Sequence, residues 1–229
     1  AARPSIADPF LPKKIEEGRL DEIRECIGCN ICIASWHDGV PVRCTQNATA
    51  GEEWRRGWHP ERFTKASQRD NVLVVGGGPA GLEAALIAAK QGFEVTIAEQ
   101  TDDWGGRVLQ ESQLPGMATW RRVRDYRVWA LSQMGNVSMY TNSELDAEAA
   151  LSFGADHIAV ATGARWTKRL YSALEIPAAP LDLPQILTPE DVFAGTITGD
   201  RVLVFDYDNY YLGGVIAEHL AEQGKAVSY

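Results

Sequence analysis

Four cysteines lie close together near the start of the chain, and cysteine thiolates are ligands for soft metal centres. Cys26, Cys29 and Cys32 follow one another at intervals of three residues, and Cys44 comes after eleven more. A loop with a ligand at every third residue can wrap three corners of a cubane, and a returning segment can supply the fourth. The spacing therefore predicts one [4Fe–4S] cluster held by these four thiolates.

Two other interpretations of these cysteines stay open. Zinc prefers two separated pairs of ligands, which a run of three closely spaced cysteines fits poorly. Thiols buried without a ligand are the second alternative. A second cluster is not expected, because Thr45 follows Cys44 where two-cluster ferredoxins have proline. Gly28 suits the tight turn that wrapping a cluster requires.

A glycine-rich turn occupies residues 76–81, which match the pattern G-x-G-x-x-G. Its glycines permit a tight turn, close approach of the backbone to a pyrophosphate, and close packing of helix on strand. Glu99 lies 23 residues after Gly76, where a carboxylate can accept hydrogen bonds from ribose hydroxyls. A turn that needs glycine only for steric reasons, with an empty site, stays the alternative. The residues expected to contact an adenine nucleotide are Gly76, Gly78, Pro79, Ala80, Gly81 and Glu99.

The elements around this turn form a βαβ unit. Residues 72–75 are an apolar run typical of a buried strand, residues 80–91 are an alanine-rich helix, and residues 94–98 give a second strand. The unpaired N–H groups at the helix start would face the phosphates. The predicted fold class is α/β: a Rossmann-like ADP-binding domain, preceded by an iron–sulfur cluster loop and followed by the start of a second Rossmann-like unit.

The end of the chain repeats the first unit. Residues 202–205, 213–223 and 226 onward show the same order of strand, helix and strand, with the strands displaced by 130 residues. The second turn carries Asp206, Asp208 and Tyr210 where phosphate would lie. Carboxylates repel phosphate and rings block approach to the backbone, so this copy is expected to keep the fold and lack a nucleotide.

The other segments connect these units. The first dozen residues are expected to lack regular structure because of their prolines, and a polar helix is expected over residues 13–24. A further strand covers residues 158–161, and residues 167–190 form a proline-rich loop. The chain is expected to be a piece of a longer protein, because residues 225–229 resemble a strand cut short. The expected domains are 1–25, the end of an upstream domain; 26–70, the cluster loop and connector; 71–200, the ADP-binding domain; and 201–229, the start of the second unit.

Composition excludes several other classes. The formal net charge of −9 disfavours nucleic acid as a partner, because phosphate binding needs clustered cations. No apolar run approaches the roughly 18 residues of a membrane span, so no membrane association is expected. The cysteines are confined to one segment, unlike a disulfide framework, which favours a reducing compartment and a cytoplasmic location. One local basic run is interpreted as a solvated helix face; it consists of Arg121, Arg122, Arg124 and Arg127.

Five segments occur in an order shared with one protein family, and they are residues 2–9, 26–30, 44–47, 57–60 and 76–81. On these segments the chain resembles the iron–sulfur flavoprotein amine dehydrogenases, which act on trimethylamine, dimethylamine or histamine. The resemblance covers essentially the whole chain, and the cysteine segment is its most specific part. It implies that residues 1–25 end a TIM-barrel domain that carries covalently bound FMN and the amine site, so no catalytic residue is expected here.

The resemblance also implies the path of electrons and the bound groups. A small amine would be oxidised at FMN, and the cluster would pass electrons to an electron-transferring flavoprotein or similar acceptor. ADP would be a structural element of a homodimeric enzyme. Arg3 matches an arginine that contacts the FMN phosphate in the family. The residues that the resemblance adds around ADP are Gly106, Arg107, Trp120 and Arg124.

Two positions depart from the trimethylamine enzymes. Arg122 aligns with an aromatic residue implicated in acceptor docking, and Glu25 with a small apolar residue, which favours histamine among the three amines. The NADPH-dependent enoyl- or dienoyl-CoA reductases are the alternative family. The altered second turn argues against them, as does the cysteine run, which in that group usually has an extra residue. A non-catalytic ADP-binding scaffold with a vestigial metal loop is the third interpretation.

Overall fold

The structure is a computed structural model that describes residues 2–57, 59–168 and 183–229. It divides into two compact units: residues 1–109 with 119–163, and residues 110–118 with 164–229. The first unit contains the four cysteines and the glycine turn. The expected domain boundaries at residues 25, 70 and 200 stay predictions. Much of the expected proline-rich loop, residues 169–182, lies outside the described residues.

A parallel sheet of four strands forms the centre of the first unit, in the order β3-β2-β1-β4. Apolar side chains fill the central strand β1, whose last four residues are buried. The carboxyl ends of β2 and β4 pair with Val75, the last residue of β1. The sheet confirms the α/β class. Its strands are β1 (Asn71–Val75), β2 (Glu94–Ala98), β3 (Val137–Tyr140) and β4 (His157–Val160).

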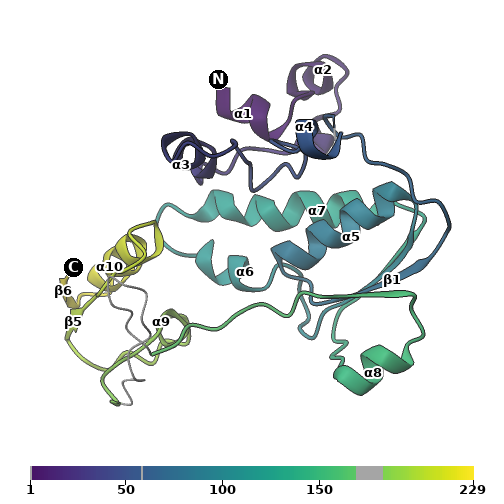
Figure 1. The fold of residues 1–229 in the computed structure, drawn as a ribbon. Helices are drawn as coiled ribbons and strands as arrows, with labels where there is room; N and C mark the ends of the chain where they lie inside the picture. The colour runs from purple at the N-terminus through teal and green to yellow at the C-terminus, as the bar shows by residue number, and fades with distance from the viewer. Residues whose placement is uncertain (1, 58, 169–182) are drawn as a thin grey trace. The chain divides into compact units, whose positions relative to one another are not determined.

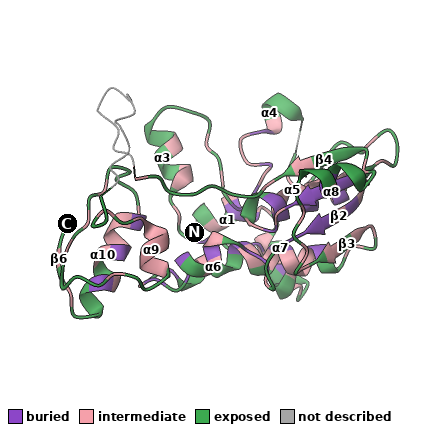
Figure 2. Cartoon of the chain, turned by 90° about the horizontal axis from the view of Figure 1, so that it is seen from below, coloured by how far each residue is buried: buried purple, intermediate pink, exposed green. Residues whose placement is uncertain are grey.

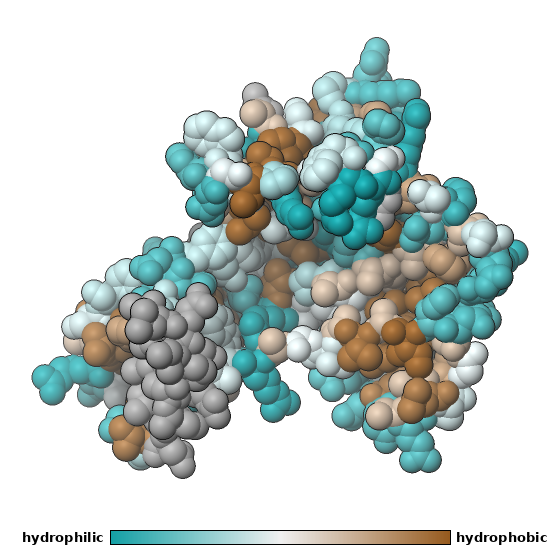
Figure 3. Space-filling view, viewed as in Figure 1, coloured by the Kyte–Doolittle hydropathy of each residue, from teal (hydrophilic) through white to brown (hydrophobic). Residues whose placement is uncertain are grey.

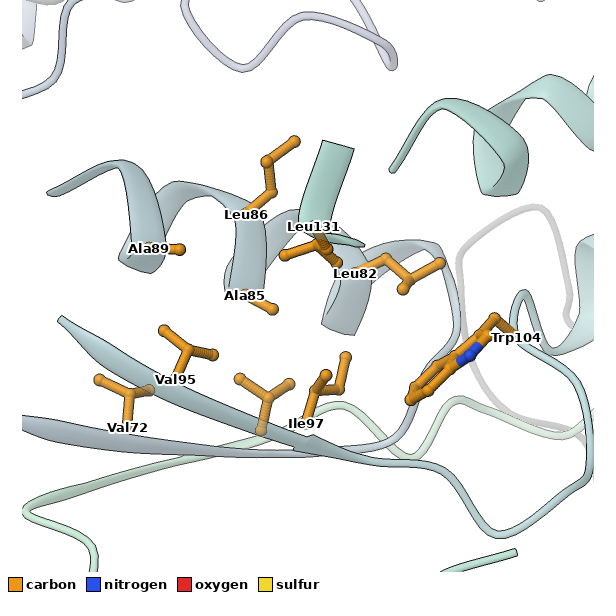
Figure 4. Packing of buried hydrophobic residues seen from close by; sticks show 10 residues of the cluster. Val72, Leu82, Ala85, Leu86, Ala89, Val95, Ile97, Trp104 and Leu131 are labelled. Carbon is orange, nitrogen blue, oxygen red and sulfur yellow. The ribbon is translucent and has the colours of Figure 1, made fainter. Parts of the chain in front are cut away.

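Two helices, α5 (Pro79–Gln91) and α7 (Arg122–Ser132), cover one face of this sheet, and α8 (Ala147–Ser152) lies on the other (Figure 1). The helix α5 ends where Gly92 adopts a left-handed conformation with φ of 102°, which glycine tolerates without strain. Leu82, Ala85 and Leu86 of α5 pack on the strands and on Leu131 of α7 (Figure 4). Purple shading in Figure 2 marks this buried layer. The core thus fixes the start of α5 relative to the strand ends.

The α8 face of the sheet is covered less completely. Leu73 and Val75 are buried there against Ala150 of α8. Apolar side chains also remain exposed on this side (Figure 3), and they include Leu151, Phe153, Ile158 and Val160.

Among the described residues, no helix is long and apolar enough to cross a membrane.

The N-terminal segment lies over α5 and α7, on the side away from the sheet (Figure 1). The expectation that the first dozen residues lack regular structure is wrong, because α1 spans Ala2–Ala7 and α2 begins at Leu11. Proline is compatible with the first turn of a helix, where its missing N–H has no partner to lose. The polar helix expected over residues 13–24 is also shorter, since α2 ends at Glu16. The other short helices of the segment are Leu20–Glu22 (3-10), α3 (Ile31–His37) and α4 (Glu53–Arg56).

A buried ion pair holds this segment together. Lys14 Nζ lies 2.7 Å from Asp8 Oδ2, which also accepts the Arg24 amide at 2.9 Å. Burial alone would raise the pKa of Asp8, but these hydrogen bonds outweigh it and hold the pKa below its usual value. A carboxyl with a lowered folded-state pKa stabilises the fold above its unfolded pKa, and this contribution is lost as the pH falls.

We therefore expect Asp8→Asn to lower the free energy of unfolding by about 3 kcal/mol at neutral pH, because Lys14 is left buried without its carboxylate. Urea unfolding measures the effect. The difference from the native protein should shrink as the pH falls below about 4, where an unfolded Asp is protonated. Asp21→Asn, at an exposed position, is the matched control. Equal losses for the two variants, or a difference independent of pH, would contradict the prediction.

The second unit contains a smaller parallel pair of strands, β5 (Arg201–Leu203) and β6 (Ala226–Ser228), joined by α10 (Leu212–Glu222). Leu212, Ile216 and Leu220 form the buried side of α10. This strand, helix and strand order agrees with the repeat expected from the sequence. A short helix, α9 (Pro189–Phe193), precedes it and carries a Thr188 capping box.

Candidate functional site

The glycine turn connects β1 to α5, and its steric demands differ from residue to residue. Gly76 has φ of 106°, and a Cβ there would lie 2.4 Å from the Ala161 carbonyl oxygen. A Cβ at Gly81 would lie 1.9 Å from the Gly76 carbonyl oxygen. A Cβ at Gly78 would meet no atom within 4 Å. Gly76 and Gly81 are therefore needed because a Cβ would clash with backbone atoms, whereas Gly78 borders open space.

The start of α5 is suited to an anion. Pro79 occupies the first turn, and Gly78 caps the helix in an extended conformation without a side-chain hydrogen bond. Helix N-termini carry unpaired N–H groups and the positive end of the helix dipole. Pro79, Ala80 and Gly81 all lie in this turn, as the nucleotide prediction requires.

Glu99 is buried at the end of β2 and supports the turn directly. Its Oε2 accepts the Gly77 amide at 2.7 Å, and its Oε1 accepts the amide and hydroxyl of Thr101 at 2.9 Å. A carboxylate has about four acceptor sites, so these bonds leave capacity for a ribose hydroxyl. The structure thus gives Glu99 a positioning role that the sequence did not indicate.

A loop after β2 lies against the glycine turn. Gly105 donates its amide to the Gly77 carbonyl at 2.8 Å, and a Cβ at Gly106 would lie 3.4 Å from Gly78 Cα. Trp104 explains the middle glycine, because a Cβ at Gly77 would lie 2.5 Å from its ring. No sequence motif singled out Trp104, although a tryptophan followed by two glycines soon after the second strand is the signal that could have indicated it.

The residues that the resemblance added around ADP occupy three different settings. Gly106 borders the turn, and Arg107 follows it as the first residue of α6 (Arg107–Glu111). Arg124 braces the adjoining loop by donating to the Asp103 carboxylate and to the Trp104 carbonyl. Trp120 instead packs on a small cluster formed by Ile27, Val108 and Val123, against which Cys29 also packs. The loop around the first cysteines is thereby attached to the nucleotide fold.

The four cysteines line one pocket. They are not joined in disulfides and have intermediate exposure, and the pocket is bordered by Arg3, Ile6, Cys26, Ile27, Cys29, Asn30, Cys32, Cys44, Thr45 and Gln46. Among the described residues, no three His, Cys, Asp or Glu side chains are arranged to hold a single metal ion. The thiols therefore border a common space and do not meet at one point.

Backbone conformation wraps the chain around this pocket. Gly28 and Asn30 have φ of 73° and 59°, both in the left-handed region. A Cβ at Gly28 would meet no atom, so its conformation, and not crowding, favours glycine there. The Gly28 amide points at Cys26 Sγ at 3.4 Å, and the Gln46 amide at Cys44 Sγ at the same distance. Two backbone amides thus donate to sulfur atoms that border the pocket.

Electrostatics at the Cys44 side of the pocket are mixed. Burial raises the pKa of the Cys44 thiol, while the amides of Gln46 and Asn47 act in the opposite direction. Buried Gln46 also donates its side-chain amide to the Glu25 carbonyl at 3.1 Å, so it touches the segments before Cys26 and after Cys44. Sequence spacing gave no signal for this role.

Arg3 also borders the cysteine pocket, where it donates to the Asn30 side chain. Its expected contact with FMN stays a prediction.

The two residues that depart from the trimethylamine enzymes form a pair, since Arg122 Nε lies 2.8 Å from Glu25 Oε2 and both side chains are about half exposed. The interpretation of the basic run as a solvated helix face is wrong for Arg127, which is only 2% exposed.

The second turn, in the second unit, is filled by its own side chain. Asp206 Oδ1 accepts the amides of Asp208 and Asn209 at 2.9 and 3.1 Å. A Cβ at Gly213 would lie 2.6 Å from the Asp206 side chain. A carboxylate thus occupies backbone donors of this turn, in agreement with the electrostatic objection raised from the sequence.

A turn of this kind on a parallel sheet defines a dinucleotide-type α/β domain, and comparison with known proteins places it in a family. The chain belongs to the pyridine nucleotide-disulphide oxidoreductase family, whose model matches residues 39–183. Within that family it is similar to the amine dehydrogenases, which confirms the resemblance drawn from the cysteine and glycine motifs.

Three relatives with different names show which proteins the chain resembles. Dimethylamine dehydrogenase of Hyphomicrobium sp. (strain x) is 44% identical over 100% of this chain and 32% of its own. The structure of histamine dehydrogenase from Rhizobium sp. 4-9 shares 50% identity, with a TM-score of 0.91 over 99% of this chain and 36% of that one. NADH oxidase of Thermoanaerobacter brockii is 36% identical over 97% of this chain and 33% of its own. The chain thus spans about a third of the length of these relatives.

Proposed function

We propose that the chain is the electron-transfer and ADP-binding portion of an iron–sulfur flavoprotein amine dehydrogenase. The observation that carries the proposal is the cysteine pocket built directly onto the nucleotide-type fold. Ile27 packs with Val108 of α6 and Val123 of α7, and Cys29 and Trp120 pack against this cluster, so the cysteine loop is anchored on helices of the nucleotide-type fold. Such an arrangement suits a fixed electron carrier better than a detachable metal loop.

The pocket would hold a [4Fe–4S] cluster through Cys26, Cys29, Cys32 and Cys44. Four thiols around one space are the donor set that a cubane needs, and such a cluster supplies one-electron transfer. The amides of Gly28 and Gln46 would donate to the ligand sulfurs of Cys26 and Cys44. Ile6 and Ile27 provide apolar lining.

The glycine turn would hold ADP. Gly78 leaves room for a pyrophosphate at the start of α5, where Pro79, Ala80 and Gly81 lie. Glu99, fixed by Gly77 and Thr101, would accept a ribose hydroxyl. Gly106 borders the same space, and Arg107, Trp120 and Arg124 remain proposed contacts by resemblance.

The remaining parts of the proposal concern the whole protein. Its substrate would be a small amine, with histamine preferred, oxidised at an FMN whose phosphate Arg3 would contact. An electron-transferring flavoprotein or similar protein would accept electrons, and the exposed pair of Arg122 and Glu25 beside Cys26 gives that acceptor a charged contact. We further propose a homodimer located in the cytoplasm, where cysteines that are not joined in disulfides stay reduced.

One observation favours a second candidate, a nicotinamide-dependent reductase of the enoyl- or dienoyl-CoA type. The similar protein from Thermoanaerobacter brockii is named an NADH oxidase. The pyrophosphate of a nicotinamide dinucleotide would need backbone N–H donors in the second turn. The amides of Asp208 and Asn209 already donate to the Asp206 carboxylate. We therefore rank the amine dehydrogenase first.

The choice is tested by electron balance in the purified full-length protein, which would contain the amine site. With histamine, dimethylamine or trimethylamine as donor, we expect a one-electron dye to be reduced while NAD and NADP stay oxidised, because the second turn cannot receive a pyrophosphate. Dye bleaching and absorbance of reduced nicotinamide are followed in parallel. Formation of reduced nicotinamide at a rate rivalling dye reduction would overturn the proposal.

A further inference from the structure

The one arginine of the basic run that is buried, Arg127, joins the two proposed cofactor sites. We propose that Arg127 is a positioning residue that holds the Cys44 segment against α5, so that nucleotide binding and cluster retention stabilise each other. The inference rests on the proposed function, because it requires that both sites be occupied. None of the sequence motifs indicated this role.

The contacts of Arg127 reach three elements. Its Nε donates to Glu83 Oε2 of α5 at 2.6 Å. One terminal nitrogen donates to Gln46 Oε1 and to the carbonyl oxygen of Val123, each at 2.8 Å, and the other donates to the Thr45 carbonyl at 3.2 Å. A planar guanidinium presents five donors in a fixed fork, so it can bind α5 and the cysteine segment together.

On the cysteine side, Arg127 binds two residues that are closely tied to the cysteine-bearing segment. Thr45 and Gln46 directly follow Cys44, and Gln46 directs its amide at the Cys44 sulfur. Gln46 is 1% exposed and also binds the Glu25 carbonyl, just before Cys26. Displacement of Gln46 would therefore move both ends of the cysteine-bearing segment.

The nucleotide side of the bridge is a helix whose first turn is the anion site. Glu83 lies four residues after Pro79 on α5, and Leu82 and Leu86 on either side of it are fully buried. Motion of Glu83 is thus transmitted to the glycine turn through a rigid element. Coupling between two binding equilibria is reciprocal, so ADP must protect the cluster as much as the cluster protects ADP.

Arg127 also has an electrostatic consequence. Reduction of a cluster adds one negative charge, and a buried cation bound to Thr45 and Gln46 favours that state. The Arg127 pair is not optimised for stability alone, because the other oxygen of Glu83 is buried with no hydrogen-bond partner in the described structure. A purely structural site would be served as well by apolar side chains.

The test uses the anaerobically purified protein with Arg127→Met and Arg127→Lys. For Arg127→Met we expect cluster bleaching by an iron chelator to accelerate about 10- to 100-fold, the usual cost of losing a group that orients a metal ligand. Bound ADP should be lost faster as well, and the cluster midpoint potential from an EPR-monitored titration should fall. Arg127→Lys should recover the potential but not the retention, because lysine keeps the charge and lacks the fork.

Arg121→Met is the matched control, since Arg121 precedes α7, is about half exposed and forms a long ion pair with Asp125, at 3.9 Å. If Arg127→Met does not fold, Gln46→Leu replaces it: added ADP should slow bleaching in the native protein but not in this variant. Native protein that contains no iron would overturn the proposed function itself. Native protein with a cluster, alongside Arg127 or Gln46 variants that bleach and retain ADP like the control, would overturn this inference alone.

Discussion

Replacing Cys29 with alanine should leave the purified protein without its cluster and without the brown colour that the cluster gives. A cubane needs four thiolates, and the native protein is expected to contain about four irons per chain. Cys29 also packs beside Ile27, Val108 and Val123, so its loss loosens the attachment of the loop to the nucleotide fold. Iron analysis and the visible absorbance of anaerobically prepared protein measure the effect.

The matched control for this prediction is Ser35→Ala. Ser35 lies on α3 in the same segment but is not among the residues that line the pocket, and its hydroxyl donates to the Ile31 carbonyl of its own helix at 2.8 Å. It should keep the full iron content. One zinc and no iron in the native protein would refute the assignment, as would full iron content in Cys29→Ala.

Gly78→Ala should abolish nucleotide retention while leaving the fold almost unchanged. A Cβ at this position meets no protein atom within 4 Å, and the extended backbone suits any residue. Stability should change by no more than about 1 kcal/mol, from the weaker helix cap. The methyl group would instead stand where a pyrophosphate approaches the backbone, so we expect ADP content to fall at least about tenfold, or about 1.4 kcal/mol of binding free energy.

Denaturing the protein and analysing the released nucleotide measures this loss. Gly135→Ala is the control, because Gly135 also borders open space and has no left-handed conformation. It should retain ADP. If Gly78→Ala releases as much nucleotide as the control, the turn does not contact a phosphate. Stoichiometric FAD in place of ADP would favour the reductase candidate.

Much of the nucleotide fold could be predicted because its determinants are local. The expected second strand, residues 94–98, coincides with β2, and α5 begins one residue before the expected start. Glycines at residues 76 and 81 are needed for contacts within the βαβ unit and the strand beside it. Short apolar runs and turn residues specify such elements with little help from the rest of the chain.

The short N-terminal helices show that a proline does not exclude a helix when it lies in the first turn. Prolines at residues 4 and 12 indicated irregular structure, yet each lies in the first turn of a helix. The buried pair of Asp8 and Lys14 supplies the tertiary stabilisation that so short a helix lacks by itself. Neither residue carries a signal in the sequence that distinguishes it from a surface charge.

By itself, the sequence determined the thiol spacing, the glycine turn and the acidic residue that ends β2, since each is a fixed offset along the chain. Only the tertiary structure decided which charges are buried and what they join. Arg127 shares a helix with exposed Arg122, but it reaches Gln46 across 81 residues of sequence. The sequence likewise indicated only that Asp206 would repel phosphate, whereas in the structure its carboxylate accepts hydrogen bonds from two amides of the turn. Both outcomes depend on which surfaces meet after folding, and no local pattern encodes that.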